Sequence, residues 1–116
     1  RTRGRRRIVL VGHSFGGAVV ITAGAPSEEV IAVAAMSSQL SGTELADQLS
    51  PRPLLLVHGT ADEVLPDRCS REIYRPAKEP KRLLLYPECR HGLDQCRQEL
   101  DRDLLAWIRE VVAPPQ

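Results

Sequence analysis

The chain has 116 residues, of which 42% are hydrophobic and only 3% aromatic, and its formal net charge is +1. This length and composition suit one soluble globular domain with an aliphatic core. The near-neutral charge gives no reason to expect nucleic-acid or membrane binding, and no run approaches the roughly 20 apolar residues that cross a bilayer.

The chain opens with RTRGRRR, in which Arg1, Arg3, Arg5, Arg6 and Arg7 are basic. We expect a solvated lead-in segment over residues 1–7 of a single partial domain that spans 1–116. A nucleic-acid-binding arm is the alternative, but no aromatic residue is interleaved with the arginines. No apolar signal segment follows them, which predicts a cytoplasmic protein.

Four short, continuously apolar runs predict strands that are buried on both faces, as in a parallel sheet. They are Ile8–Val11, Val30–Ala35, Leu54–Val57 and Leu83–Tyr86.

Helices are expected between and after the strands, over Phe15–Ala25, Thr43–Leu49 (short), Asp67–Ala77 and Asp94–Val112. In the last of these, an apolar stripe recurs at helical spacing through Leu100, Leu104, Ile108 and Val111. The alternation predicts an α/β fold, with a mostly parallel sheet of four strands and helices on both faces. The working site of such a sheet lies beyond the carboxyl ends of its strands.

The first strand is followed by Gly12-His13-Ser14-Phe15-Gly16. This segment matches G-x-S-x-G, the nucleophile elbow. The strained turn presents the serine hydroxyl, and glycine is expected at the two flanking positions because they approach each other closely. The backbone N–H of Phe15 can donate to an oxyanion. His13 is expected to point away from the serine. A tightly packed glycine turn without chemistry is the alternative.

Asp62 follows the third strand in HGTADEVLP. A carboxylate there can hold a histidine in the tautomer that a general base needs. The alternatives are that Asp62 only caps a turn, or that Glu63 or Asp67 is the acid. His58 ends the buried strand, and we expect it to support the Asp62 turn.

His91 follows the fourth strand, in a loop before the last helix. Histidine suits general base catalysis near neutral pH, although a lone loop histidine is often only solvated. The order Ser14, Asp62, His91 is that of one known triad arrangement.

Three motifs occur in the order GHSFGG, HGTADEVLP and RHG. Together they resemble the α/β-hydrolase superfamily, and within it the dienelactone hydrolases and small esterases. The resemblance implies Ser14 as nucleophile, Asp62 as acid, His91 as base and the Phe15 amide as an oxyanion donor. It implies a serine hydrolase that acts on small-molecule carboxylic esters or related acyl compounds without a cofactor. Dienelactone hydrolases proper carry cysteine at the nucleophile position.

The family places several strands before the elbow, whereas here the elbow follows the first strand. The chain therefore resembles the second half of the fold, without the loop that supplies the second oxyanion donor. The Ile8–Val11 strand becomes an open edge that invites pairing with another chain or a second copy. The alternative function is therefore a truncated hydrolase half with little activity that associates through this edge.

The chain has an odd number of cysteines and no CxxC pair among them. They are Cys69, Cys89 and Cys96. We expect reduced thiols instead of a disulfide framework. Cys89, His91 and Cys96 supply only three ligands at irregular spacing, so no metal site is expected.

Overall fold

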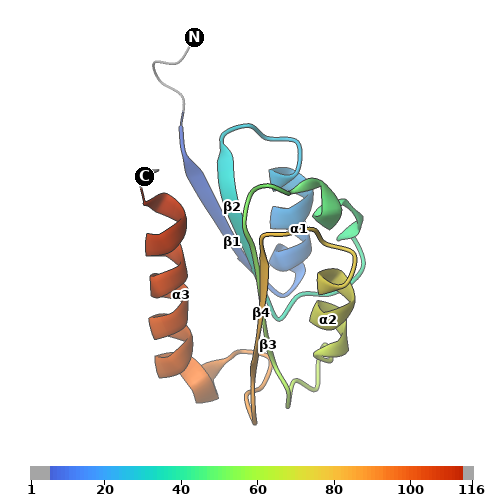
Figure 1. Ribbon diagram of the computed structural model, residues 1–116. Coiled ribbons are helices and arrows are strands. Elements are labelled where there is room, and N and C mark those ends of the chain that lie inside the picture. The colour runs from blue at the N-terminus through green and yellow to red at the C-terminus, as the bar shows by residue number, and fades with distance from the viewer. Residues whose placement is uncertain (1–5, 114–116) are drawn as a thin grey trace.

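The computed structural model describes residues 6–113, as an α/β fold in which strands and helices alternate (Figure 1). Residues 1–5, with most of the expected basic lead-in segment, lie outside the described residues, while Arg6 and Arg7 are exposed. The elements are β1 (Ile8–His13), α1 (Phe15–Gly24), β2 (Val30–Met36), the 3-10 turn η1 (Glu44–Gln48), β3 (Leu54–Gly59), α2 (Arg68–Tyr74), β4 (Lys81–Tyr86), the 3-10 turn η2 (Asp94–Cys96) and α3 (Arg97–Val112).

The strands form a parallel sheet in the order β1-β2-β3-β4, which confirms the predicted fold class. His13 pairs with Met36 at the ends of β1 and β2, and Gly59 pairs with Tyr86 at the ends of β3 and β4. The carboxyl ends of the strands therefore lie at one edge of the sheet, where the loops that follow β1, β3 and β4 meet.

The sheet is the middle of three layers, with α1 and α2 on one face and α3 on the other (Figure 1). Side chains alternate between two cores, because successive residues of a strand point to opposite faces. In β3, Leu54 and Leu56 pack on the α1 side, whereas Leu55 and Val57 pack on the α3 side. Burial on both faces explains why β3 is an unbroken apolar run.

The last predicted helix divides into two parts. Residues Asp94–Cys96 form the 3-10 turn, and the α-helix begins at Arg97. The predicted stripe packs against the sheet. The most buried side chain of α3 is Trp107, which is 2% exposed and lies on the same helix face, although the prediction did not include it. None of the helices in residues 6–113 is long and apolar enough to cross a membrane.

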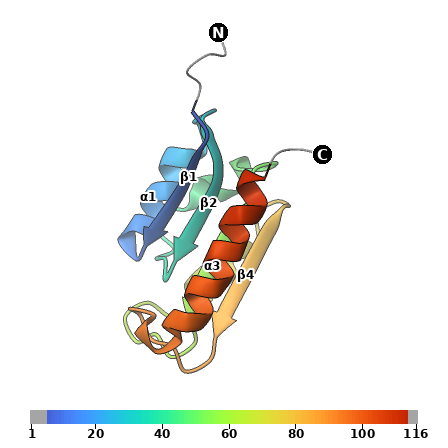
Figure 2. The same ribbon diagram turned by 90° about the vertical axis from the view of Figure 1, so that its left-hand side faces the viewer.

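β1 is an edge strand, as the sequence predicts. Figure 2 shows α3 over the part of the sheet near β4, with β1 at the opposite edge. Val11 in β1 is 40% exposed, and Phe15 and Val19 on the neighbouring α1 are 66% and 45% exposed. The β1 edge therefore combines unpaired strand backbone with the exposed apolar side chain of Val11.

Arg52, before β3, closes the end of α1. Its guanidinium donates hydrogen bonds to the carbonyl oxygens of Gly24 and Ser27 at 2.8 Å and of Ala25 at 2.7 Å. Its Nε also donates to the carbonyl of Leu49 at 3.0 Å. The last carbonyls of a helix have no partner within that helix, so one side chain satisfies a set of otherwise unpaired acceptors.

We expect Arg52→Ala to lower the free energy of unfolding by about 2–3 kcal/mol, because buried carbonyls lose a charged donor. Urea unfolding followed by circular dichroism measures the loss. Arg75→Ala is the matched control, since Arg75 makes an exposed ion pair with Glu72, and such pairs contribute about 0–1 kcal/mol. Equal losses in both variants would contradict this role of Arg52.

Candidate active site

Ser14 lies in the tight turn between β1 and α1, with φ 62° and ψ −123°. A non-glycine residue rarely adopts a positive φ, and such strain concentrates at functional sites. A Cβ on Gly12 would lie 2.1 Å from the carbonyl oxygen of Gly16. Only glycine therefore fits at position 12, and the predicted strand-turn-helix surroundings of Ser14 are present.

Gly12 and Gly16 approach each other closely, as predicted, but the prediction was wrong that position 16 must itself lack a side chain. A Cβ on Gly16 would meet nothing within 4 Å, whereas a Cβ on Gly17 would lie 2.7 Å from that of Ser38. The second position that requires glycine is therefore the next residue, Gly17, where α1 packs against the segment after β2. The GG pair in the motif gives no means of telling which glycine is required.

The structure brings Ser14, His91 and Asp62 together from three loops at the carboxyl edge of the sheet. His91 Nε2 lies 2.9 Å from Ser14 Oγ, and His91 Nδ1 lies 2.8 Å from Asp62 Oδ2. Because Nδ1 faces a carboxylate, it carries the proton in the neutral ring. The Nε2 lone pair then accepts the Ser14 hydroxyl, which is the arrangement that lets an imidazole act as a base.

Asp62 is buried, with a side chain that is 0% exposed. Its Oδ1 accepts hydrogen bonds from the backbone N–H groups of Val64 at 2.9 Å and Leu65 at 2.8 Å. Burial by itself raises the pKa of Asp62, but the hydrogen bonds from Leu65, His91 and Val64 outweigh burial and lower the pKa below its ordinary value of 3.8. The carboxylate is therefore ionised at neutral pH.

The lowered pKa of Asp62 makes a testable contribution to stability. The unfolded chain binds a proton at this carboxyl at a higher pH than the folded chain does. The stabilisation is therefore fully present above the ordinary pKa of 3.8 and is lost as the pH falls through the lowered folded pKa. We expect the difference in unfolding free energy between the parent chain and Asp62→Asn to shrink from pH 7 to about pH 2, as measured by urea unfolding. A difference that is constant across this range would contradict the assignment.

The backbone carbonyl of His91 accepts two side-chain hydrogen bonds. Ser37 Oγ donates from the end of β2 at 2.9 Å, and His13 Nε2 donates from the end of β1 at 2.8 Å. The ring of His13 therefore contacts the loop that carries the candidate base, whereas the prediction concerned only its direction relative to Ser14. Ser37 was missed by the sequence reasoning, although its place directly after β2 was a signal for it.

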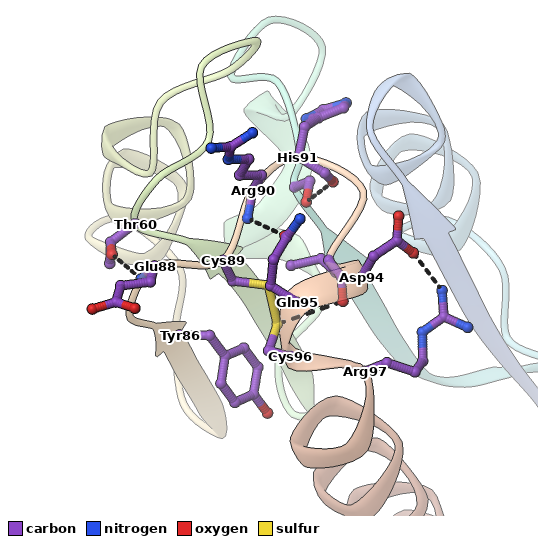
Figure 3. Close-up of a disulfide and its surroundings, with 12 residues drawn as sticks. Thr60, Tyr86, Glu88, Cys89, Arg90, His91, Asp94, Gln95, Cys96 and Arg97 are labelled. Atoms are coloured by element: carbon purple, nitrogen blue, oxygen red, sulfur yellow. Dashed lines mark hydrogen bonds and ion pairs between the residues drawn. A yellow bond between two sulfur atoms is a disulfide. The ribbon is translucent and has the colours of Figure 1, made fainter.

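The loop after β4 also contains a disulfide between Cys89 and Cys96, which corrects the prediction of reduced thiols (Figure 3). The loop turns back through Leu93, which has a left-handed φ of 64°. This turn leaves the two Cα atoms 5.8 Å apart, within the usual disulfide range. The cross-link encloses His91, while Cys69 is free and buried.

The rival acids lie elsewhere. Glu63 is exposed, and Asp67 pairs with Arg71 at 2.9 Å on α2. Asp62 is the acid in contact with His91.

The Phe15 amide lies at the N-terminus of α1, where helix N–H groups have no partner within the helix. Such groups favour negative charge. The Phe15 side chain faces outward and, with Val19 and Gly42, helps line an open groove of about 450 Å³ along α1. An apolar surface therefore begins one residue after Ser14.

Solved structures share this arrangement of elements. The chain is similar to the esterase domain of a Rhodothermus marinus protein, with a TM-score of 0.78 and 24% identity over 90% of this chain. It is also similar to the α/β hydrolase GrgF from Penicillium sp. sh18, with a TM-score of 0.79 and 16% identity over 96% of this chain. The chain has part of the α/β-hydrolase fold.

The chain is also similar to curated sequences. The uncharacterized protein YfhR of Escherichia coli strain K12 is 36% identical over an alignment of 109 residues, and the match covers 74% of this chain. No protein-family model matches the chain. The chain spans 38% of the length of YfhR, 62% of the Rhodothermus domain and 66% of GrgF.

Proposed function

We propose that this chain carries the catalytic triad of a serine hydrolase that cleaves carboxylic esters or related acyl compounds. The observation that carries the proposal is the hydrogen-bonded line Ser14–His91–Asp62, with a buried and ionised acid at its end. The strained φ of Ser14 adds support, because an elbow presents its hydroxyl to a substrate.

In the proposed reaction, His91 Nε2 takes the Ser14 proton while Oγ attacks the substrate carbonyl carbon. The carbonyl oxygen becomes an oxyanion, to which the Phe15 N–H donates a hydrogen bond. The imidazolium then protonates the departing alcohol, which leaves Ser14 acylated. His91 next removes a proton from water, the hydroxide attacks the acyl carbon, and the acid is released with Ser14 reprotonated.

The proposed substrate class follows from the motifs and from the residue at position 14. We place the chain among small esterases of the dienelactone-hydrolase type, because GHSFGG, HGTADEVLP and RHG resemble that group. Serine at position 14, in place of cysteine, favours simple esters over dienelactones. The Rhodothermus neighbour is described as an esterase domain, which is consistent with this choice.

A fluorophosphonate probe tests the proposal, because it reacts with a serine that a neighbouring base activates. We expect labelling of the folded chain that is lost in Ser14→Ala and in His91→Ala. Heat-unfolded chain is the control for nonspecific reaction. Absence of labelling in chain shown to be folded by circular dichroism would contradict the proposed activity.

A second candidate function rests on the open β1 edge. We propose that this edge pairs with a second copy of the chain, which is how a partial hydrolase with little activity would associate. Unpaired strand edges template such pairing, and Val11 is exposed on β1.

Size-exclusion chromatography with light scattering tests the association. We expect an oligomer that Val11→Lys dissociates, while Val112→Lys on the exposed end of α3 is the matched control. A monomer at all accessible concentrations would contradict the pairing.

A further inference from the structure

A second histidine contacts the same oxygen of Asp62 as His91 does. His58 lies in β3 and is 0% exposed. Its Nε2 is 3.2 Å from Asp62 Oδ2 and 2.7 Å from the carbonyl oxygen of Leu65. Its Nδ1 is 2.6 Å from Ser70 Oγ on α2. Both ring nitrogens of this buried imidazole therefore have partners.

The partners of His58 determine its tautomer. Nε2 faces a carboxylate oxygen and a carbonyl oxygen, which can only accept, so Nε2 carries the proton. In the neutral ring, Nδ1 then accepts a hydrogen bond, and the Ser70 hydroxyl is its donor. The tautomer is the reverse of that in His91, whose Nδ1 carries the proton.

The result is a continuous chain of contacts, Ser14–His91–Asp62–His58–Ser70, with Asp62 Oδ2 at its centre. Its links are hydrogen bonds except the one between His58 and Asp62, where Nε2 lies 3.2 Å from Oδ2 while its hydrogen bond goes to the Leu65 carbonyl. One half of this chain is the proposed triad. The other half connects Asp62 to β3 and α2, which are regular elements, whereas Asp62 itself lies in a loop.

We propose that His58, held by Ser70, is a positioning residue that keeps Asp62 Oδ2 aimed at His91 Nδ1. The catalytic consequence of this role rests on the proposed hydrolase function. The backbone N–H groups of Val64 and Leu65 hold only Oδ1. Oδ2 is buried, and the polar Nε2–H of His58 lies 3.2 Å from it on a rigid strand, which favours the orientation of the carboxylate toward His91. The hydrogen bond from His58 to the Leu65 carbonyl also fixes the turn whose N–H groups hold Oδ1.

Four variants test this role. His58→Leu removes both hydrogen bonds, whereas His58→Gln can place an N–H near the position of Nε2 and is the conservative rescue. Ser70→Ala removes only the donor to Nδ1. Ser38→Ala is its matched control, because Ser38 is equally buried but donates to the Gln39 carbonyl outside this network.

The first measurement needs no turnover. Proton NMR follows solvent exchange of the His91 Nδ1–H, which is slow while that proton is held by Asp62. We expect exchange about 10-fold faster or more in His58→Leu, an intermediate change in Ser70→Ala, and values near the parent chain in His58→Gln and Ser38→Ala. Unchanged exchange in folded His58→Leu overturns the proposal. If His58→Leu does not fold, unchanged exchange in folded Ser70→Ala overturns it.

The second measurement is ester hydrolysis by the same variants. We expect His58→Leu to lower kcat by about 10²-fold with little change in KM, because misplacing a reactive group weakens the transition state more than substrate binding. A parent chain that shows the protected His91 proton but no hydrolysis would contradict the proposed function and leave the positioning role intact. Ester hydrolysis by the parent chain, together with a His91 Nδ1–H exchange rate that is unchanged in His58→Leu, would contradict only the positioning role.

Discussion

Ser14→Ala is expected to lower kcat for an activated ester such as 4-nitrophenyl acetate by about 10⁴- to 10⁶-fold, the range found when a triad nucleophile is removed. The loss arises because alanine has no hydroxyl to attack the carbonyl, and because His91 Nε2, 2.9 Å from Ser14 Oγ, then has nothing to deprotonate. Steady-state kinetics on both proteins, purified in parallel, measures the ratio.

Ser27→Ala is the control for Ser14→Ala. Ser27 lies in the turn between α1 and β2, at the opposite edge of the sheet from Ser14, and its replacement is expected to leave kcat unchanged. Equal turnover by the parent chain and Ser14→Ala would show that Ser14 is not the nucleophile.

Asp62→Asn is expected to lower kcat by about 10⁴-fold with little change in KM, the effect typical of this substitution in a triad. The amide oxygen takes the position of Oδ1, since that position accepts from the N–H groups of Val64 and Leu65. The NH₂ group then faces His91 Nδ1, which must accept. The proton moves to Nε2, so His91 can no longer take a proton from Ser14.

Asp67→Asn is the matched control, because Asp67 forms a surface ion pair with Arg71 and does not contact His91. We expect its kcat to match that of the parent chain, and near-ultraviolet circular dichroism checks that both variants keep the packing around Trp107. If Asp62→Asn kept the parent kcat, Asp62 would have no role in holding the His91 tautomer.

The sequence by itself determined the order of the elements and the type of sheet. Strands buried on both faces must be apolar at successive positions, and the runs at β2 and β3 follow this requirement, so local composition is sufficient to predict them. The turn at Ser14 was predictable for a similar reason, because the Gly12 requirement is set by residues within four positions of it.

Only the tertiary structure decided which polar groups meet. Three sets of contacts depend on how separate loops and elements pack. They are the hydrogen bonds of His13 and Ser37 to the His91 carbonyl, the contact of His58 with Asp62, and the Cys89–Cys96 disulfide. Hydrogen bonds and disulfides form only within a few ångströms, and residues separated along the chain reach that distance only when the sheet brings the strand ends together. Spacing in the sequence carries no such distance, which is why the candidate triad was predictable by pattern but its supporting contacts were not.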